Sequence, residues 1–476
     1  MRKNIAEDKE KLKEKLEYIG LNLERIPKFL TEFTPFSFRP LKSYNDTTYK
    51  VYKYIDVNNI EILLTPTDRL TNLNEKYKLS SPIGNYLDSK TEQNVEKFAT
   101  FLRLLNDTNI EDIKKVASLN EGKNLKYCIL TMGCQLNEND SEKLCGMMES
   151  MNYTKTDKLS DTDLIVFNTC CVRENAEDKL FGKLGEVKKY KEAKGTIIAI
   201  GGCMMQEKHI VDKLKQSYPF FDIVFGTHTL QEFPTDLYNV LCNKKRIEDV
   251  LDIDGDVIEG LPISREDKIK ASVTIMNGCN NFCSYCIVPY VRGRERSRHP
   301  KDILQEVEQL AKEGYKEITL LGQNVNSYLV SEDWKGKGLE YKGINSFATL
   351  LREINKIEGI ERIRFVSPHP KDFTDDVIEA IADCEKVCKL IHLPLQSGSS
   401  KVLKTMNRKY TKEQYLALVE KMKAKIPNLT LSTDIIVGFA GETEEDFEDT
   451  LDVVRKVCFE QVYMFIYSRR VGTPGD

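Results

Sequence analysis

Strand-like and helix-like apolar patterns alternate along the middle of the chain. Short apolar runs occur at Tyr127–Met132, Leu164–Asn168, Ile197–Gly201 and Asp222–Gly226. Stretches with helical periodicity, such as 137–151 and 174–190, lie between these runs. This order is typical of βαβ units with a parallel sheet. It predicts an α/β domain over residues 123–240, followed by a charged linker that contains Asp and Gly at 241–268.

The same alternation repeats about six times over residues 269–476. The candidate strands are Ser272–Met276, Glu317–Leu321, Arg362–Ser367, Lys389–Leu395, Thr430–Val437 and Gln461–Ser468. Helices between them carry start signals, because Pro300 suits a first helical position and Thr411 with Gln414 forms a capping box. Six βα units in ~200 residues predict an open or partial (βα)6 barrel, shorter than the eight-unit form.

Residues 1–122 differ from the rest of the chain. They are rich in Lys, Asn, Asp and Tyr and contain none of the cysteines. Residues 4–32 and 92–106 have helical patterns, and TTYKVYKYIDVNNIEILL alternates like strands. No chemical motif occurs here, so we expect an α+β extension of unknown role, for scaffolding or docking.

Composition and charge narrow the class of protein. Of 476 residues, 70 are basic and 74 acidic, which gives a net charge of −4 and excludes a globally basic nucleic-acid binder, although not a local basic patch. The charged start has no apolar signal core, and no run reaches the ~20 apolar residues of a membrane span. We therefore expect a cytoplasmic protein with no membrane partner.

The cysteines indicate metal or redox chemistry. There are 13, an odd number, and a cytosolic chain does not keep a disulfide framework. Cys279, Cys283 and Cys286 form C-x3-C-x2-C directly after the first barrel strand. Three thiolates at this spacing can hold a cubane iron–sulfur cluster and leave its fourth iron open. Zinc usually needs a fourth ligand, and no second knuckle follows. The alternative is a buried trio of small apolar side chains.

A second group of cysteines is dispersed. Cys134, Cys170 and Cys203 each follow a predicted strand, about one βα unit apart. Such positions share one edge of a parallel sheet, so the three thiols can converge there. The alternatives are a coincidence of buried cysteines, and a swap of Cys170 for the adjacent Cys171.

Several motifs resemble those of a known family. The cysteine loop, with Tyr285 before its last cysteine, resembles that of radical S-adenosylmethionine enzymes. The segments GCQLNENDS, NTCCVRENA, GGCMMQ and FGTHTL resemble the amino-terminal domain of the methylthiotransferases. Downstream, LGQNVNSY, HLPLQSGSSKVLKTMNRKYT, DIIVGFAGETEEDF and YSRRVGTP resemble the same family. The resemblance covers about residues 125–476, and VPYVRGRERSR with GQNVNSY is most similar to the MiaB type.

The resemblance implies two 4Fe-4S clusters and S-adenosylmethionine as cofactors. The catalytic cluster would lie on Cys279, Cys283 and Cys286 and generate a 5′-deoxyadenosyl radical. The cluster on Cys134, Cys170 and Cys203 would carry or supply sulfur, which a first S-adenosylmethionine methylates. In this way residues 123–240 would form the second-cluster domain and 269–476 the radical SAM core.

The resemblance also implies a substrate and partners. The MiaB type adds a methylthio group to C2 of N6-dimethylallyladenosine, just 3′ of the tRNA anticodon, and needs an electron donor such as flavodoxin or ferredoxin and a sulfur donor. Alternatives are N6-threonylcarbamoyladenosine in tRNA, an aspartate of a ribosomal protein, or a silent iron–sulfur RNA-binding scaffold. The family continues into a small RNA-gripping TRAM domain, and because the sequence ends at Asp476 we expect this domain to be absent.

Polar residues supply further candidates. Arg292, Arg294, Arg296 and Arg298 recur at every second position, so in an extended chain they would line one face and contact RNA phosphates. The alternative is that these arginines lie on a solvated surface or pair with Glu295. Ends of barrel strands point into a barrel mouth. There we expect S-adenosylmethionine or the adenine edge to be held by Gln323, Asn324, Gln396, Ser397 and Asp434. Turn formation and helix capping are the alternative, above all at Ser397.

Overall fold

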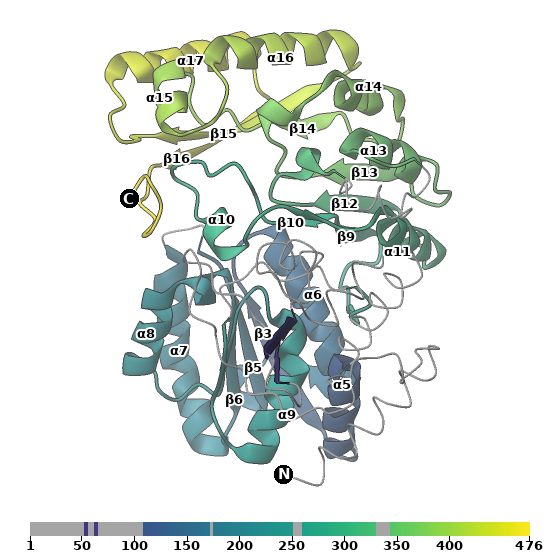
Figure 1. Cartoon of the computed structure of the whole chain (residues 1–476), viewed down its shortest axis with the longest axis vertical. Coiled ribbons are helices and arrows are strands. Elements are labelled where there is room, and N and C mark those ends of the chain that lie inside the picture. The colour runs from purple at the N-terminus through teal and green to yellow at the C-terminus, as the bar shows by residue number, and fades with distance from the viewer. Residues whose placement is uncertain (1–51, 56–60, 65–107, 172–174, 251–258, 330–342) are drawn as a thin grey trace.

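The computed structural model describes residues 52–55, 61–64, 108–171, 175–250, 259–329 and 343–476. Most of these residues form two α/β domains, stacked along the long axis of the molecule (Figure 1). Strands β1 (Tyr52–Ile55) and β2 (Glu61–Leu64) form an antiparallel pair inside the stretch predicted to be strands. The helices predicted at 4–32 and 92–106 lie outside the described residues.

A parallel six-stranded sheet forms the first domain, in the order β4-β3-β5-β6-β7-β8. Its strands are β3 (Leu125–Thr131), β4 (Tyr153–Lys155), β5 (Leu164–Thr169), β6 (Ile197–Gly202), β7 (Ile223–Phe225) and β8 (Ile247–Asp249). The four predicted strands are confirmed. The edge strands β4 and β8 were not predicted, because their residues, YTK and IED, do not form an apolar run.

Helices cover both faces of this sheet (Figure 1). One face packs against α7 (Asn175–Lys194) and α8 (Lys208–Ser217), and the other against α5 (Thr108–Leu119), α6 (Gln135–Ser150) and α9 (Phe233–Asn243). Within β5, Ile165 and Phe167 point to the first face and Leu164 and Val166 to the second. Burial on both faces explains why this strand is a continuous apolar run.

The structure corrects two predicted boundaries of this domain. Helix α5 belongs to the predicted extension 1–122, yet its Ile113 and Val116 are buried against the sheet. At the other end, α9 continues to Asn243 and β8 pairs with β7, so 241–249 is part of the domain rather than of the linker. Both segments are rich in charged residues. Their few buried residues were therefore not recognised from the sequence pattern.

Six parallel strands form the second domain as an open, partial barrel, as predicted. They are β9 (Lys270–Thr274), β12 (Glu317–Leu321), β13 (Arg362–Phe365), β14 (Leu390–His392), β15 (Thr430–Val437) and β16 (Gln461–Ile466). Two three-stranded sheets, β13-β12-β9 and β14-β15-β16, are linked by a parallel bridge between Ile363 and Val387. A short antiparallel pair, β10 (Met276–Asn277) and β11 (Arg296–Ser297), closes the loop after β9.

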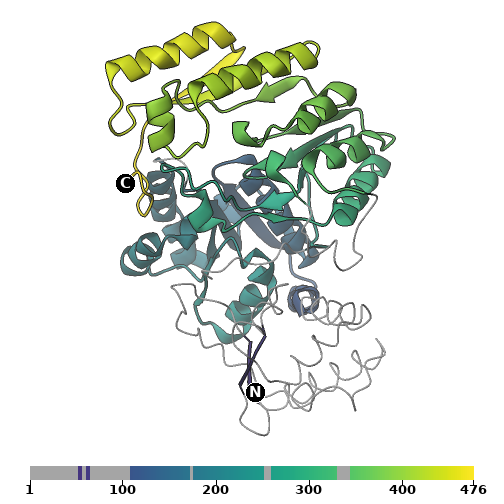
Figure 2. The same ribbon diagram turned by 45° about the horizontal axis from the view of Figure 1, so that its top comes forward.

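The helices of this domain form an outer layer over the sheets, which Figure 2 shows from a second angle. They are α11 (Pro300–Lys312), α13 (Phe347–Asn355), α14 (Asp375–Asp383), α15 (Ser400–Thr405), α16 (Lys412–Lys425) and α17 (Glu444–Val457). Pro300 is the first residue of α11, and Thr411 and Gln414 form a capping box on α16, as predicted. No helix in the described ranges combines the length and apolar composition that a bilayer crossing requires.

Direct contacts join the two domains. The Thr274 hydroxyl donates to Asn139 Oδ1 over 2.9 Å, which ties β9 to α6. Gly146 of α6 touches the backbone of Pro262, where a Cβ would lie 2.4 Å from the carbonyl oxygen. These contacts place the carboxyl edge of the first sheet beside the loop that follows β9.

Candidate functional site

Three cysteines gather at the carboxyl edge of the first sheet. Cys134 is the N-cap of α6, just after β3. Cys170 directly follows β5, and Cys203 follows β6 and begins a short 3-10 helix, η3 (Cys203–Gln206). Because β3, β5 and β6 are neighbours in the sheet, the predicted shared edge is confirmed.

Asn137 lies between these cysteines. Its Oδ1 is 3.9 Å from Cys134 Sγ and 3.7 Å from Cys203 Sγ. Its Nδ2 donates to the Thr169 carbonyl at 2.8 Å, immediately before Cys170. The Asn137 side chain thus contacts the thiols of Cys134 and Cys203 and the residue that precedes Cys170.

Cys170 and Cys171 both lie close to the other cysteines of this group. Cys170 lies against Gly133, where an added Cβ would be 2.6 Å from the Cys170 sulfur, and Gly133 directly precedes Cys134. Cys171 belongs to the apolar cluster under α7 and α8. A hydrogen bond from Cys171, and then the charge of Arg292, hold the pKa of Cys203 below its usual range, whereas the pKa of Cys171 is raised. The Cys170 sulfur therefore lies beside Gly133 and Cys134, the Cys171 thiol contacts Cys203, and the lowered pKa of Cys203 favours a thiolate there.

Arg292 reaches this group of cysteines from the other domain. Its Nε donates to Cys203 Sγ over 3.1 Å, and its Nη2 lies 2.8 Å from Asn137 Oδ1 and 2.7 Å from Asp140 Oδ2. The residue is only 5% exposed. Its guanidinium therefore faces the interior of the molecule and not solvent.

The loop cysteines lie between β10 and β11. The Cys279 N–H donates to the Gly293 carbonyl over 3.1 Å, and the Cys286 N–H donates to the Cys283 carbonyl over 2.9 Å. Burial raises the pKa of Cys279 to about 11 and that of Cys286 to about 12. Both thiols are therefore protonated at neutral pH, and metal binding at this loop must release protons.

A strained residue shapes this loop. Phe282 has a φ of 48°, in the left-handed region that bulky residues rarely adopt. The Arg294 guanidinium lies 4.3 Å from the centre of its ring, and the Asn407 amide donates to its carbonyl over 2.8 Å. These contacts hold a conformation that is costly for an isolated chain.

Arg408 approaches the loop from the barrel. Its Nη1 lies 3.4 Å from Cys283 Sγ and 3.3 Å from the Tyr285 hydroxyl, while Nη2 donates to the Pro394 carbonyl. Arg408 was not among the site residues predicted from the sequence. The motif MNRKY carries it, but nothing in the sequence indicates that this guanidinium reaches a cysteine more than a hundred residues earlier.

Both cysteine groups fit an iron–sulfur cluster by the chemistry of their donors. Each group offers three thiols, and a buried arginine donates a hydrogen bond to one of its sulfurs. No histidine takes part in the hydrogen bonds to Cys134, Cys203 and Cys283 named above. In the described residues, no three Cys, His, Asp or Glu side chains are close enough to hold a single metal ion. A four-iron cluster takes its thiolates at wider spacing than one ion does, so this finding is compatible with a cluster.

The polar residues Gln323 and Asn324 follow the carboxyl end of β12. Asn324 Nδ2 donates to Glu295 at 3.0 Å and to Asp372 at 2.9 Å. Among the described residues, the buried oxygens Gln323 Oε1 and Asn324 Oδ1 have no hydrogen-bond partner, and neither has Nε2 of His369. Buried polar atoms without partners are rare in folded proteins. A polar ligand such as S-adenosylmethionine would supply hydrogen-bond partners for these three atoms.

Gln396 and Asp434 lie on adjacent chain segments. The Gln396 N–H donates to the Asp434 carbonyl over 2.8 Å, and Gln396 has a φ of 71°. Asp434 Oδ2 is 3.2 Å from His392 Nε2. The Ser397 hydroxyl instead accepts from the Ser399 N–H. For Ser397 the structure therefore favours turn formation over ligand binding.

The four alternate arginines do not share an exposed face, which corrects that prediction. Arg292 is buried at the cysteines, and Arg298 is buried against Glu259 and Glu306, 2.8 Å from the latter. The chain is extended over only two residues of β11, and the two buried arginines form ion pairs with the partly exposed carboxylates of Asp140, Glu259 and Glu306. Arg294 is exposed and Arg296 partly so, and these two remain candidates for RNA contact.

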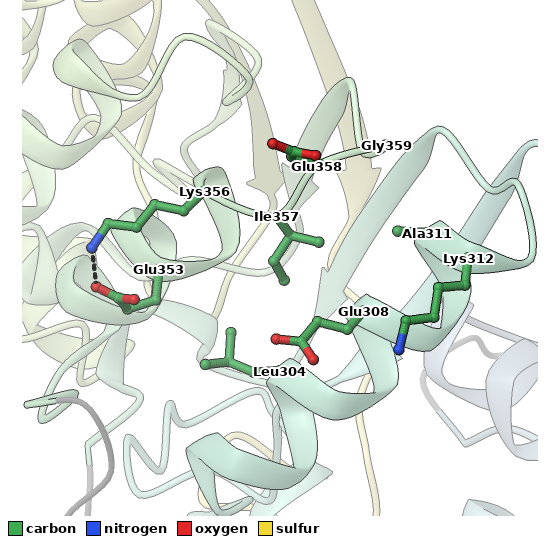
Figure 3. Close-up of a pocket in the computed structure, with 9 residues that line it drawn as sticks. All are labelled: Leu304, Glu308, Ala311, Lys312, Glu353, Lys356, Ile357, Glu358 and Gly359. Carbon is green, nitrogen blue, oxygen red and sulfur yellow. Dashed lines mark hydrogen bonds and ion pairs between the residues drawn. The ribbon is translucent and has the colours of Figure 1, made fainter.

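A surface hollow lies elsewhere on the barrel domain. Its walls are α11, α13 and the turn before β13, and Figure 3 shows Glu308, Lys312 and the Glu353–Lys356 ion pair around it. No cysteine or strand-end residue lines it. It is a groove between outer helices and is separate from the candidate site.

Comparisons with known proteins cover both domains. The Radical SAM superfamily matches residues 273–454, and Uncharacterized protein family UPF0004 matches 126–226. A protein of Acetivibrio thermocellus, tRNA-2-methylthio-N(6)-dimethylallyladenosine synthase, is 55% identical over 369 residues, 77% of this chain and 75% of that one. The protein of the same name from Clostridium perfringens is 55% identical over 351 residues, 74% of this chain and 76% of that one.

A solved structure gives an independent comparison of the fold. The radical S-adenosylmethionine methyltransferase TsrM from Kitasatospora setae matches with a TM-score of 0.52 at 14% identity, over 72% of this chain and 73% of that one. At this identity the likeness concerns the fold alone.

Proposed function

This chain belongs to the family of radical S-adenosylmethionine tRNA methylthiotransferases, and we propose that it adds a methylthio group to C2 of N6-dimethylallyladenosine beside the tRNA anticodon. The observation that carries the proposal is the juxtaposition of two groups of three cysteines, one from each domain, with Arg292 between them. The 55% identity to synthases of that name supports the choice of substrate.

Six cysteines would hold the cofactors. Cys279, Cys283 and Cys286 would bind one 4Fe-4S cluster, and Cys134, Cys170 and Cys203 the other. When bound, the reduced first cluster supplies the electron that cleaves S-adenosylmethionine to a 5′-deoxyadenosyl radical, and the second supplies sulfur. Arg408 and Arg292 would each stabilise negative charge on a ligand sulfur through a charge-assisted hydrogen bond.

Residues at the barrel mouth would bind S-adenosylmethionine and the adenine of the substrate. We assign this role to Gln323, Asn324, Gln396 and Asp434, with His369 as an addition, because three of these side chains carry buried polar atoms without a partner in the described residues. Ser397 would shape the turn that presents Gln396. Arg294 and Arg296 would contact the RNA backbone, since they are the accessible members of the arginine series.

The reaction requires partners as well as tRNA. A one-electron donor such as flavodoxin or ferredoxin would reduce the first cluster, and a sulfur donor would replace the sulfur that each turnover consumes. From the proposed tRNA substrate we infer a cytoplasmic location. Use of N6-threonylcarbamoyladenosine or of a protein aspartate would keep the chemistry and change the substrate. A silent iron–sulfur scaffold would cleave no S-adenosylmethionine.

Two cysteine variants separate the proposed roles. Cys283→Ala should abolish formation of 5′-deoxyadenosine, because it removes a ligand of the radical-forming cluster. Cys170→Ala should leave this cleavage intact and abolish thiomethylation of dimethylallyl-tRNA. Both products are measured by chromatography and mass spectrometry after anaerobic reconstitution, and about eight irons and eight sulfides per chain are expected in the parent protein.

Cys242→Ala serves as the control, because this exposed cysteine at the end of α9 belongs to neither group. It should keep both activities. About four irons per chain in the parent, or thiomethylation by Cys170→Ala, would refute the two-cluster assignment.

A further inference from the structure

The seven residues from Cys286 to Arg292 connect the two cysteine groups. Cys286 is the last cysteine of the loop, and α10 (Val288–Val291) follows it. Arg292 then donates to Cys203 Sγ over 3.1 Å. One short, partly helical segment therefore touches both proposed cluster sites, and a fully extended chain of this length would span at most roughly 21 Å between its end Cα atoms.

This segment is fixed on the surface of the first domain. Ile287 and Val291 are 5% and 2% exposed and pack in the same apolar cluster as Cys203, Met204 and Met205. The Thr227 hydroxyl donates to the Val291 carbonyl over 2.6 Å. Because α10 is held both by apolar packing and by this hydrogen bond, it has little freedom to shift against the first sheet.

The charge of Arg292 has few partners in this environment. The residue is 5% exposed, and Asp140, at 2.7 Å, is its ion-pair partner. Nε is directed at the Cys203 sulfur instead of a second carboxylate. A buried guanidinium is costly unless its donors are used, and a negatively charged sulfur is a suitable acceptor.

Arg408 provides the contrast. It donates to Cys283 Sγ, and all of its partners, Cys283, Tyr285, Pro394 and Tyr410, belong to its own domain. Arg292, in contrast, carries a cationic donor from the barrel domain to a sulfur of the first domain. Its position thus depends on how the two domains are docked.

We propose that residues 286–292 form a rigid spacer between the two cysteine groups, in which Arg292 is a positioning residue that orients and stabilises the Cys203 sulfur. This rests on the proposed function, because it assumes that Cys203 ligates the second cluster. The spacer keeps the group that makes the radical close to the group that supplies sulfur. A single residue thereby links domain docking to the electronic state of the second site.

The first test uses the full-length, metal-free chain. Arg292→Gln should speed amide hydrogen exchange in residues 203–206 and 288–292 by about tenfold or more, since a hydrogen-bonded charge is lost at the interface. Arg292→Lys should give a smaller change. Arg455→Gln, at an exposed arginine on α17 whose ion pair with Glu448 is 3.8 Å long, should leave both segments at the parent rate.

The second test examines the cluster site in a background with Cys279, Cys283 and Cys286 changed to alanine. An anaerobic redox titration followed by electron paramagnetic resonance measures the midpoint potential of the remaining cluster. Arg292→Gln should lower this potential, because loss of a cationic hydrogen bond to a ligand sulfur disfavours the more negative reduced state. Arg455→Gln should leave this potential unchanged.

The outcomes separate this inference from the proposed function. Unchanged exchange or an unchanged potential in Arg292→Gln would overturn the spacer role of Arg292 even if the enzyme thiomethylates tRNA. If the alanine background binds no iron, the second cluster of the proposed function fails, and the exchange rates alone decide whether Arg292 couples the domains.

Discussion

Gly133 shows how one residue without a side chain shapes the cysteine edge. Its φ is 113°, and an added Cβ would lie 2.6 Å from the sulfur of Cys170. Gly133→Ala should therefore displace Cys134 or Cys170 and sharply lower the iron bound by the second group, as measured by iron analysis in the background without the loop cysteines. A positive φ also disfavours alanine by roughly 1 kcal/mol.

Gly122→Ala is the matched control. This glycine has a φ of 74° but no atom within 4 Å of the added Cβ. Gly122→Ala should lose about as much stability as Gly133→Ala, and its second cysteine group should still bind iron. Equal iron in both variants would contradict a steric role for Gly133.

At the scale of the element, α17 depends on a charged capping box. Thr443 caps the helix, and the Asp446 carboxylate accepts from Lys401, from Ser399 and from the Thr443 N–H. These bonds, that of Lys401 first, hold the pKa of Asp446 below its usual range. A carboxyl with a lowered folded-state pKa stabilises the fold above its unfolded pKa of about 3.9, and this contribution disappears as the pH falls toward the folded value.

Asp446→Asn should therefore lower the Tm at pH 7, and its difference from the parent should shrink as the pH drops below about 4. Differential scanning calorimetry at several pH values measures this difference. Glu448→Gln is the control on the same helix, because its ion pair with Arg455 is exposed and long, at 3.8 Å. A pH-independent penalty for Asp446→Asn would show that its charge is not what the helix uses.

At the scale of the whole molecule, the linker helps to dock the domains through α6. Gly146 leaves room for the Pro262 backbone, where a Cβ would lie 2.4 Å from the carbonyl oxygen. Gly146→Ala should destabilise the protein by about 1–3 kcal/mol, because overpacking outweighs the gain of about 1 kcal/mol in helix propensity. The free energy of unfolding in urea measures the change.

Gly185→Ala in α7 meets no atom within 4 Å and should be neutral or slightly stabilising. If Gly146→Ala changes the free energy of unfolding as little as Gly185→Ala does, the linker does not hold the interface between the two domains.

The sequence alone determined the alternation of strands and helices in both domains and the positions of the six cysteines directly after predicted strands. These follow from local rules: apolar periodicity marks a strand, and the residues after neighbouring parallel strands share an edge. Cys134, Cys170 and Cys203 were found in this way, although the cluster that they would bind remains a proposal. Charged or very short segments such as α5 and β8 were not assigned to the first domain, because their few buried residues show no period.

Only the tertiary structure decided which polar side chains meet. Arg292 and Arg298 look alike in an alternating series, yet one reaches Cys203 and the other reaches Glu259 and Glu306. Arg408 contacts Cys283 across a long stretch of sequence. A directional hydrogen bond depends on the packing of distant elements to within a fraction of an ångström, and no local pattern of residues carries that information.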